Sequence, residues 1–214
     1  MSPRARRRDT PSARVIVFDL GNVLIPWDRR WLFATLIDDP AALDHFCENV
    51  LSLDDNARLD AGLPLTELVA DLVQRHPDHQ ATLEAFESRW DETVGPAINA
   101  SVAILRSLLD AGHRCYALSN WNADTFAMIE GRYPFLTWFD DLVISGREGL
   151  IKPDPAIYRL LCDRHGFEPG DAVFIDDSPT NVAAAGALGF DAIVFESPDQ
   201  LAADLADRGL PDGP

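Results

Sequence analysis

The chain has 214 residues, of which 47% are hydrophobic and 25% charged, a balance typical of one soluble globular domain with room for an insertion. Its formal net charge of −17 argues against a nucleic-acid-binding surface, and no apolar run approaches the roughly 20 residues that a membrane span needs. The three cysteines lie far apart without a CxxC pair, which indicates reduced thiols and a cytoplasmic location.

The chain opens with a basic segment whose charge differs from that of the rest. Residues 1–14 read MSPRARRRDTPSAR and hold five arginines and one aspartate, so the remainder carries a charge of −21. We expect residues 1–13 to form a disordered, solvated tail rather than a nucleic-acid-binding arm. The apolar run that follows is short and contains an aspartate, so it does not resemble a signal peptide.

Five short apolar runs are expected to form strands: Arg14–Leu20, His113–Ser119, Asp141–Ser145, Ala172–Asp176 and Asp191–Phe195. Their hydrophobic residues are continuous rather than alternating, as in strands that helices cover on both faces. Four helical segments with Pro or Asp near several of their starts accompany the later runs: Ala123–Gly131, Asp154–His165, Pro179–Leu188 and Pro198–Arg208. This alternation predicts an α/β fold with a doubly wound, parallel, Rossmann-like sheet.

The segment between the first two predicted strands has helical character instead. Apolar residues recur there at helical spacing in four stretches: Trp31–Ile37, Pro40–Leu51, Leu65–His76 and His79–Val94. We therefore expect an inserted all-α cap over residues 28–96, with Asp54 and Asp55 on one of its solvated faces. The core would comprise residues 14–27 and 97–210, and would resume with a helix over Ile98–Asp110.

Polar residues collect where the predicted strands end. They are Asp19 after the first strand, Ser119 and Asn120 at the second, Lys152 after the third, and Asp176 and Asp177 at the fourth. The carboxyl ends of parallel strands share one edge, so these side chains are expected to line one crevice. A carboxylate can attack phosphorus, aspartate oxygens suit Mg²⁺, and lysine supplies positive charge, so the set favours phosphoryl transfer.

Each of these residues also has a purely structural interpretation. Asp19 could be a turn residue, and Lys152 could be a surface lysine. Ser119-Asn120 and Asp176-Asp177 could cap the helices that follow them. Their joint occurrence at four strand ends is what favours a site.

The segments DLGNV, LSN, IKPDP and FIDDS resemble, in order and strand context, the four motifs of the haloacid dehalogenase (HAD) superfamily. The resemblance covers about residues 14–200, and the helical insertion lies where this family carries its small cap. DLGNVLI with LSNWN resembles the branch that contains α-D-glucose-1-phosphate phosphatases. The resemblance implies an Mg²⁺-dependent phosphatase of a small phosphorylated metabolite. We expect this enzyme to act in the cytoplasm as a monomer or homodimer, without nucleic-acid or membrane partners.

The resemblance also implies which residues bind the metal. Asp19 would be both the nucleophile and a metal ligand, and the carbonyl of Gly21 would be a second ligand. Asp177 would bind Mg²⁺ directly, and Asp176 would act through a water molecule.

Other residues would contact the substrate. Ser119 and Asn120 would bind the phosphoryl group, and Lys152 would screen it from the nucleophile. Trp121 lies beside this proposed phosphate loop and is assigned to substrate binding.

Gly21 departs from the family pattern, which usually has a second aspartate there as general acid and base, a function worth ~10²–10⁴-fold in rate. Asp28, in PWDRR at the mouth of the cap, is our first candidate for the group that replaces this acid, and His45 is the second. Alternatively, the leaving group needs little help, as with the hemiacetal oxygen of an anomeric phosphate. A metal-independent 2-haloacid dehalogenase and a degraded phosphometabolite-binding protein are the remaining alternatives.

Overall fold

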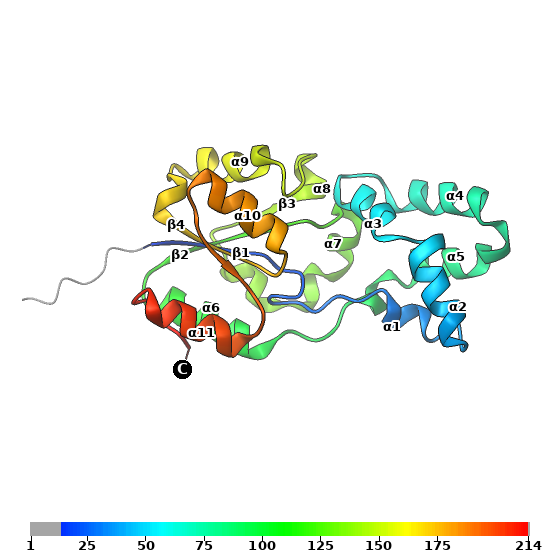
Figure 1. Ribbon diagram of the computed structural model, residues 1–214, viewed down its shortest axis with the longest axis horizontal. Helices are drawn as coiled ribbons and strands as arrows, with labels where there is room; N and C mark the ends of the chain where they lie inside the picture. Colours follow the sequence, from blue (N-terminus) through cyan, green and yellow to red (C-terminus); the bar gives the residue numbers. More distant parts are fainter. Residues whose placement is uncertain (1–13, 214) are drawn as a thin grey trace, which may run out of the picture.

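The computed structural model describes residues 14–213 and contains a parallel sheet flanked by helices, with a helical cap at one end (Figure 1). The strands are β1 (Val15–Phe18), β2 (Arg114–Ser119), β3 (Asp141–Ile144), β4 (Ala172–Asp176) and β5 (Asp191–Val194). Their order is β3-β2-β1-β4-β5, and every neighbouring pair is parallel. All five predicted strands are present, four of them slightly shorter, whereas the predicted tail, residues 1–13, lies outside the described residues.

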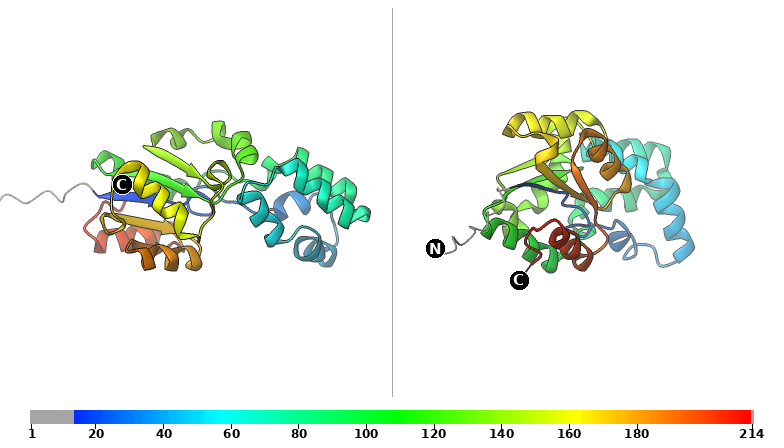
Figure 2. Two further views of the ribbon diagram at one scale, coloured as in Figure 1. Left: turned by 90° about the horizontal axis from the view of Figure 1, so that it is seen from above. Right: turned by 60° about the vertical axis from the view of Figure 1, so that its left-hand side comes forward.

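Helices cover both faces of this sheet, which confirms the doubly wound α/β fold (Figures 1 and 2). The core helices are α6 (Asn99–Asp110), α7 (Ala123–Ile129), α8 (Ser145–Glu148), α9 (Pro155–His165), α10 (Pro179–Leu188) and α11 (Pro198–Asp207). Short 3₁₀ turns lie between them: η4 (Glu130–Arg132), η5 (Pro134–Trp138) and η6 (Pro169–Asp171).

The composition of β1 follows from its central place in the sheet. Ile16 and Phe18 pack on one face, in the hydrophobic cluster that includes residues of α6 and α11. Val15 and Val17 pack on the other face, in the cluster formed with α9 and α10. Successive side chains of a strand point to opposite faces, so a strand that is buried on both sides must be apolar throughout.

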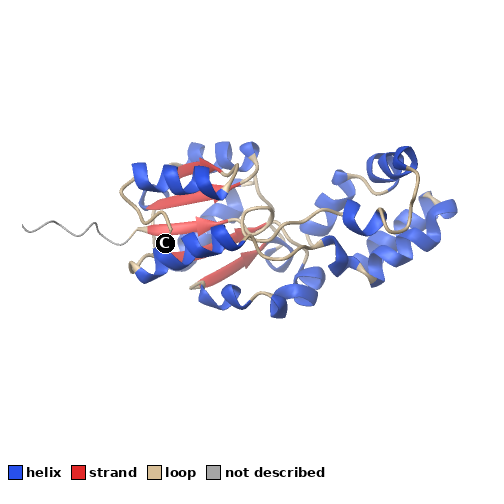
Figure 3. Ribbon diagram, turned by 90° about the horizontal axis from the view of Figure 1, so that it is seen from below, coloured by secondary structure: helices blue, strands red, loops and turns tan. Residues whose placement is uncertain are grey.

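The cap contains helices but no strand among the residues that the structure describes (Figure 3). Its elements are α1 (Arg30–Phe33), α2 (Pro40–His45), the π-helical η1 (Phe46–Val50), α3 (Leu53–Asp60), α4 (Leu65–Arg75), η2 (Pro77–His79), α5 (Gln80–Ser88) and η3 (Trp90–Thr93). The two connections to the core lie side by side, because Trp27 and Val94 form an antiparallel bridge and the Gly95 N–H donates to the Pro26 carbonyl at 2.9 Å.

Helix α3 corrects the expectation that Asp54 and Asp55 both face solvent. Asp54 is exposed, but Asp55 is buried. Asp55 forms a capping box with Ser52 at the start of the helix and an ion pair with Arg75 at 2.8 Å. These partners satisfy the Asp55 carboxylate and fix the start of α3, whose last residue, Asp60, lies at the core.

Two further properties bear on the sequence expectations. Cys47, Cys115 and Cys162 are all buried free thiols. Within residues 14–213, no helix has both the length and the apolar character that a membrane crossing requires.

Candidate active site

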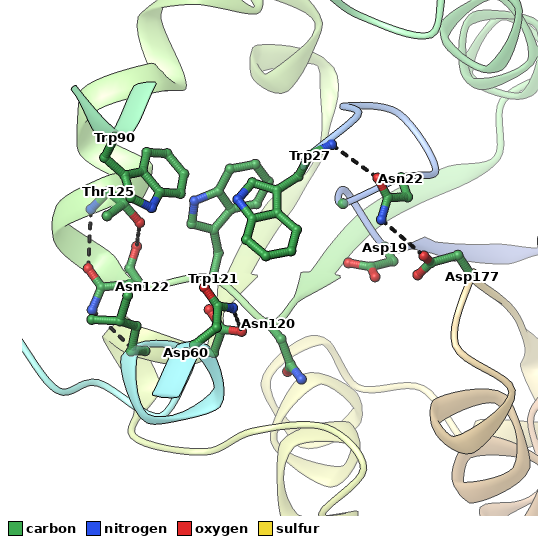
Figure 4. A pocket seen from close by; sticks show the side chains of 13 residues that line it. Asp19, Asn22, Trp27, Asp60, Trp90, Asn120, Trp121, Asn122, Thr125 and Asp177 are labelled. Carbon is green, nitrogen blue, oxygen red and sulfur yellow. Dashed lines mark hydrogen bonds between the residues drawn. The ribbon is translucent and has the colours of Figure 1, made fainter. Parts of the chain in front are cut away.

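The carboxyl ends of β1, β2 and β4 open into a cavity of about 140 Å³ that the cap covers (Figure 4). Five of the predicted site residues line it: Asp19, Gly21, Asn120, Trp121 and Asp177. The other lining residues come from the turn after β1, from α3 and η3, and from the start of α7: Asn22, Trp27, Asn56, Leu59, Asp60, Trp90, Asn122 and Thr125. The cavity is therefore built from core and cap together.

The two carboxylate oxygens of Asp19 have different surroundings. Its backbone N–H donates to the Ile175 carbonyl at 2.8 Å, which extends the pairing of β1 with β4. Oδ1 accepts hydrogen bonds from Ser119 Oγ at 2.6 Å and from the Leu20 N–H at 2.7 Å, and lies 3.1 Å from Lys152 Nζ. Within the described chain, Oδ2 has no such partner. Its lone pairs are thus free to attack an electrophile or to bind a cation.

Burial raises the pKa of Asp19 to about 7, while the positive charge of Lys152 acts in the opposite direction. The negative charge of Asp176 adds to the increase. A cation beside these carboxylates would favour the ionised, nucleophilic form of Asp19.

Lys152 is a fully buried ammonium group with three oxygen partners. Its Nζ donates to Asp176 Oδ2 at 2.6 Å and to the Leu118 carbonyl at 2.8 Å, in addition to its contact with Asp19. Burial disfavours the charge, but the two carboxylates outweigh it and raise the pKa of Lys152. The lysine therefore provides a fixed positive charge next to Asp19.

Asp176 and Asp177 differ in how much of their coordinating capacity is free. Asp176 is fully buried, and besides Lys152 it accepts hydrogen bonds from the Ser178 N–H at 2.8 Å and from Asn181 Nδ2 at 3.1 Å. Asp177 is partly exposed to the cavity and accepts one weak hydrogen bond, from Asn22 Nδ2 at 3.3 Å. Asp177 is thus the more available ligand, and Asp176 holds the lysine.

The three aspartates fit a magnesium ion. Asp19, Asp176 and Asp177 each offer an oxygen within 4.8 Å of the other two. Hard carboxylate oxygens are the donors that Mg²⁺ prefers, and it usually keeps several waters. Burial, followed by repulsion from Asp176, raises the pKa of Asp177, and a divalent cation would offset both effects.

The turn after Asp19 links the first and fourth motifs. Asn22 adopts a left-handed conformation with φ of 54°, which asparagine tolerates better than most residues. Its side chain accepts a hydrogen bond from the Trp27 N–H at 3.0 Å and donates to Asp177 (Figure 4). A Cβ atom added to Gly21 would meet no atom within 4 Å. Packing would therefore allow an aspartate side chain at this position, where the family pattern usually has one.

The structure places the predicted phosphoryl-binding pair beside the catalytic groups. The Ser119 hydroxyl donates to Asp19 and is buried, and Ser119 does not line the cavity. Asn120 accepts a hydrogen bond from the Lys152 N–H at 2.8 Å and donates to the Lys152 carbonyl at 2.9 Å. The two residues thus position Asp19 and Lys152.

The structure does not bring Asp28 or His45 to the cavity. The Asp28 carboxylate accepts the N–H of Arg30 at 2.8 Å, in a local turn at the start of α1. His45 is exposed and lies beside Asn49 within the cap. Helix α3 of the cap lines the cavity together with Asp19, and neither Asp28 nor His45 belongs to this helix.

Asp60, which the sequence analysis did not identify, lies at the cavity instead. It ends α3, and Figure 4 shows it on the cap side, with Asp19 and Asp177 on the core side. Asn56 Nδ2 donates to Asp60 Oδ2 at 3.1 Å. The only sequence signal is the helix-ending LDAGL, which does not distinguish this acid from the other acids of the cap.

The apolar wall of the cavity is formed by tryptophans. Trp90 and Trp121 meet edge to face with ring centroids 6.0 Å apart, and Trp27 lines the cavity as well. The indole N–H groups of Trp90 and Trp121 are buried and find no acceptor in the part of the chain described here. Such an unpaired donor costs about 1–3 kcal/mol, which an acceptor oxygen on a bound molecule would offset.

A parallel sheet with a buried aspartate, a lysine and an acid pair at its carboxyl edge, beneath an inserted helical cap, defines a capped α/β hydrolase. The protein belongs to the haloacid dehalogenase-like hydrolase family, whose model matches residues 13–189.

Similar proteins include two phosphatases and a flavin mononucleotide hydrolase. The chain is 24% identical over 189 residues to a D-ribitol-5-phosphate phosphatase of Bacteroides thetaiotaomicron, covering 82% of this chain and 88% of that protein. It is also 24% identical over 189 residues to a sesquiterpene phosphatase of Aspergillus oryzae, covering 82% of this chain and 86% of the other. A chloroplast flavin mononucleotide hydrolase of Arabidopsis thaliana is 42% identical over 76 residues, which are 36% of this chain and 30% of that protein.

Solved structures share the fold. A HAD-family enzyme of Bacteroides thetaiotaomicron, in complex with magnesium and inorganic phosphate, superposes with a TM-score of 0.70 at 20% identity, over 86% of this chain and 94% of the other. The L-2-haloacid dehalogenase of Xanthobacter autotrophicus gives a TM-score of 0.60 at 17% identity, over 92% and 84% of the two chains. These structures show the shared fold, and the family match places the chain among the haloacid dehalogenase-like hydrolases.

Proposed function

We propose that the protein is an Mg²⁺-dependent phosphatase that hydrolyses a small phosphate monoester through an aspartyl-phosphate on Asp19. The observation that carries this proposal is the free Oδ2 of Asp19 at the cavity, with Oδ1 fixed by Ser119 and by Lys152 at 3.1 Å. A nucleophile needs one free oxygen and a fixed orientation, and this arrangement supplies both. The phosphatases among the relatives also support it.

In the first step, Asp19 Oδ2 attacks phosphorus and the bond from phosphorus to the leaving oxygen breaks. The positive charge of Lys152 offsets the repulsion between the approaching anions. In the second step, a water molecule attacks the same phosphorus, and phosphate and the Asp19 carboxylate are released.

Asp19, Asp177 and the Gly21 carbonyl would hold Mg²⁺, with Asp176 acting through a water molecule. When bound there, Mg²⁺ polarises the phosphoryl oxygens and stabilises the charge of the transition state. Of these residues, Asp19, Gly21 and Asp177 line the cavity itself.

A sugar or polyol phosphate is the proposed substrate. The cavity of about 140 Å³ suits a compact organic group, because pockets for drug-sized ligands measure roughly 300–1,000 Å³. Its indole faces suit the C–H surface of a sugar, and the amides of Asn56, Asn120 and Asn122 suit hydroxyl groups. The DLGNVLI and LSNWN segments make anomeric phosphates such as α-D-glucose 1-phosphate the first to screen.

We propose that the enzyme is a monomer or homodimer that acts in the cytoplasm.

Phosphate release from p-nitrophenyl phosphate and a panel of sugar phosphates, with Mg²⁺ and with EDTA, tests the proposal. We expect Mg²⁺-dependent release that Asp19→Asn abolishes and that Asp54→Asn, an exposed cap substitution, leaves unchanged. Metal-independent halide release from 2-chloropropionate would instead support the dehalogenase, which the missing acid at Gly21 also fits. Phosphate binding without turnover would support a degraded binding protein.

A further inference from the structure

We propose that Asp60, supplied by the cap, is the general acid and base that takes the place of the aspartate missing at Gly21. This inference rests on the proposed phosphatase function. Three carboxylates line the cavity among residues 14–213: Asp19, Asp60 and Asp177. With Asp19 assigned to the nucleophile and Asp177 to the metal, Asp60 remains for proton transfer, and no histidine of the described chain lines the cavity.

The core, and not only the cap, fixes the position of Asp60. Ser145 Oγ, from the first residue of α8, donates a hydrogen bond to the Asp60 carbonyl at 2.5 Å. Asn122 Nδ2 donates to the Leu59 carbonyl at 3.0 Å and to the Leu63 carbonyl at 2.9 Å. Two core side chains thus hold the end of α3 over the nucleophile, which is the preorganisation that proton transfer needs.

The surroundings of Asp60 favour the protonated form that a general acid requires. Burial raises the pKa of Asp60 to about 8, and the negative charge of Asp19 adds to this effect. Lys152 acts in the opposite direction, as does the hydrogen bond from Asn56. This environment favours the neutral carboxyl group, which becomes a base once it has donated its proton.

The proton balance of the reaction follows. As Asp19 Oδ2 attacks phosphorus, the electron pair of the breaking P–O bond passes to the leaving oxygen, which takes the proton of Asp60 and departs as an alcohol. The Asp60 carboxylate then takes a proton from the water that attacks the aspartyl-phosphate. The bond from phosphorus to Asp19 breaks, phosphate leaves, and Asp60 is again protonated. Because α3 supplies the acid, catalysis requires a docked cap.

Single-turnover kinetics of Asp60→Asn with two probes test this assignment. p-Nitrophenolate leaves without a proton, whereas the alkoxide of glycerol 1-phosphate needs one. We expect the rate constant for phosphorylation of Asp19 to fall about 10²–10⁴-fold with glycerol 1-phosphate and to stay near wild type with p-nitrophenyl phosphate. With p-nitrophenyl phosphate, the variant should also show a burst of p-nitrophenol, because hydrolysis of the aspartyl-phosphate lacks its base.

Asp54→Asn, on the same helix but exposed, is the matched control and should behave as wild type with both probes. Gly21→Asp in the Asp60→Asn background should restore part of the lost rate, since a side chain at Gly21 meets open space. Equal losses with both probes, or no burst, would overturn the assignment of Asp60 while leaving Asp19-dependent phosphatase activity in place. A wild-type protein that hydrolyses neither probe would instead overturn the proposed function, and this inference with it.

Discussion

Asn122 links the cap to the core, and its substitution separates two roles of one side chain. Its Oδ1 accepts the N–H groups of Asp124 and Thr125 at 2.9 and 3.2 Å, which caps the start of α7. Its Nδ2 donates to the carbonyls of Leu59 and Leu63 in the cap. Asn122→Asp keeps the acceptor but removes both donors, whereas Asn122→Ala removes both functions.

The size of each effect follows from these contacts. Two hydrogen bonds worth about 1 kcal/mol each hold the end of α3 on the core. Their loss in Asn122→Asp should weaken cap docking by about 2 kcal/mol, or roughly 30-fold in the ratio of docked to undocked cap, at about 1.4 kcal/mol per tenfold. Asn122→Ala should lose the same docking energy and a further ~1 kcal/mol of global stability, because α7 also loses its cap.

Hydrogen exchange of residues 53–60 measures docking, and urea denaturation measures global stability. We expect faster exchange of α3 in both variants, and a loss of urea stability that is about 1 kcal/mol larger in Asn122→Ala than in Asn122→Asp. Turnover of glycerol 1-phosphate should fall in both, since Asp60 leaves the cavity when α3 undocks. Unchanged exchange of α3 in Asn122→Asp would refute the idea that this side chain holds the cap.

The remaining predictions concern charge and metal. Asp60 has a folded-state pKa of about 8, above the ordinary value of 3.8, so the folded protein binds more protons than the unfolded chain between about pH 4 and pH 8. Without metal, the free energy of unfolding should therefore fall as the pH rises across this range, and Asp60→Asn should make that fall smaller in urea titrations. If the substitution left the pH dependence of the free energy of unfolding unaltered, the raised pKa of Asp60 would be contradicted. Lys152→Met leaves the carboxylates of Asp19 and Asp176 buried without their partner and should cost about 3–5 kcal/mol in urea denaturation at pH 8. A loss below ~1 kcal/mol would show that the ion pairs of Lys152 with Asp19 and Asp176 are not essential to the fold. If Mg²⁺ binds the folded state as proposed, it should raise the Tm, and Asp177→Asn should remove most of that increase; an equal increase in the variant would place the ion elsewhere.

The sequence by itself determined the core and its reactive edge. A run such as VIVF is apolar at every position, as expected of a strand covered on both faces, and the structure buries all four residues. Parallel strands place their carboxyl ends together, so Asp19, Lys152 and Asp177 were predicted to converge without knowledge of the packing. These features follow from rules that act along the chain.

Only the tertiary structure decided which acid of the cap lines the cavity with Asp19. Asp28, Asp55 and Asp60 are alike as residue types, yet one caps a local turn, one is buried in ion pairs and one lines the cavity. The difference depends on the hydrogen bonds that Asn122 and Ser145 donate to carbonyl groups at the end of α3. Each donor lies about 60–85 residues from its acceptor in the sequence. Local patterns fix which face of a helix is apolar, but the docking of one unit on another selects the side chain that enters the site.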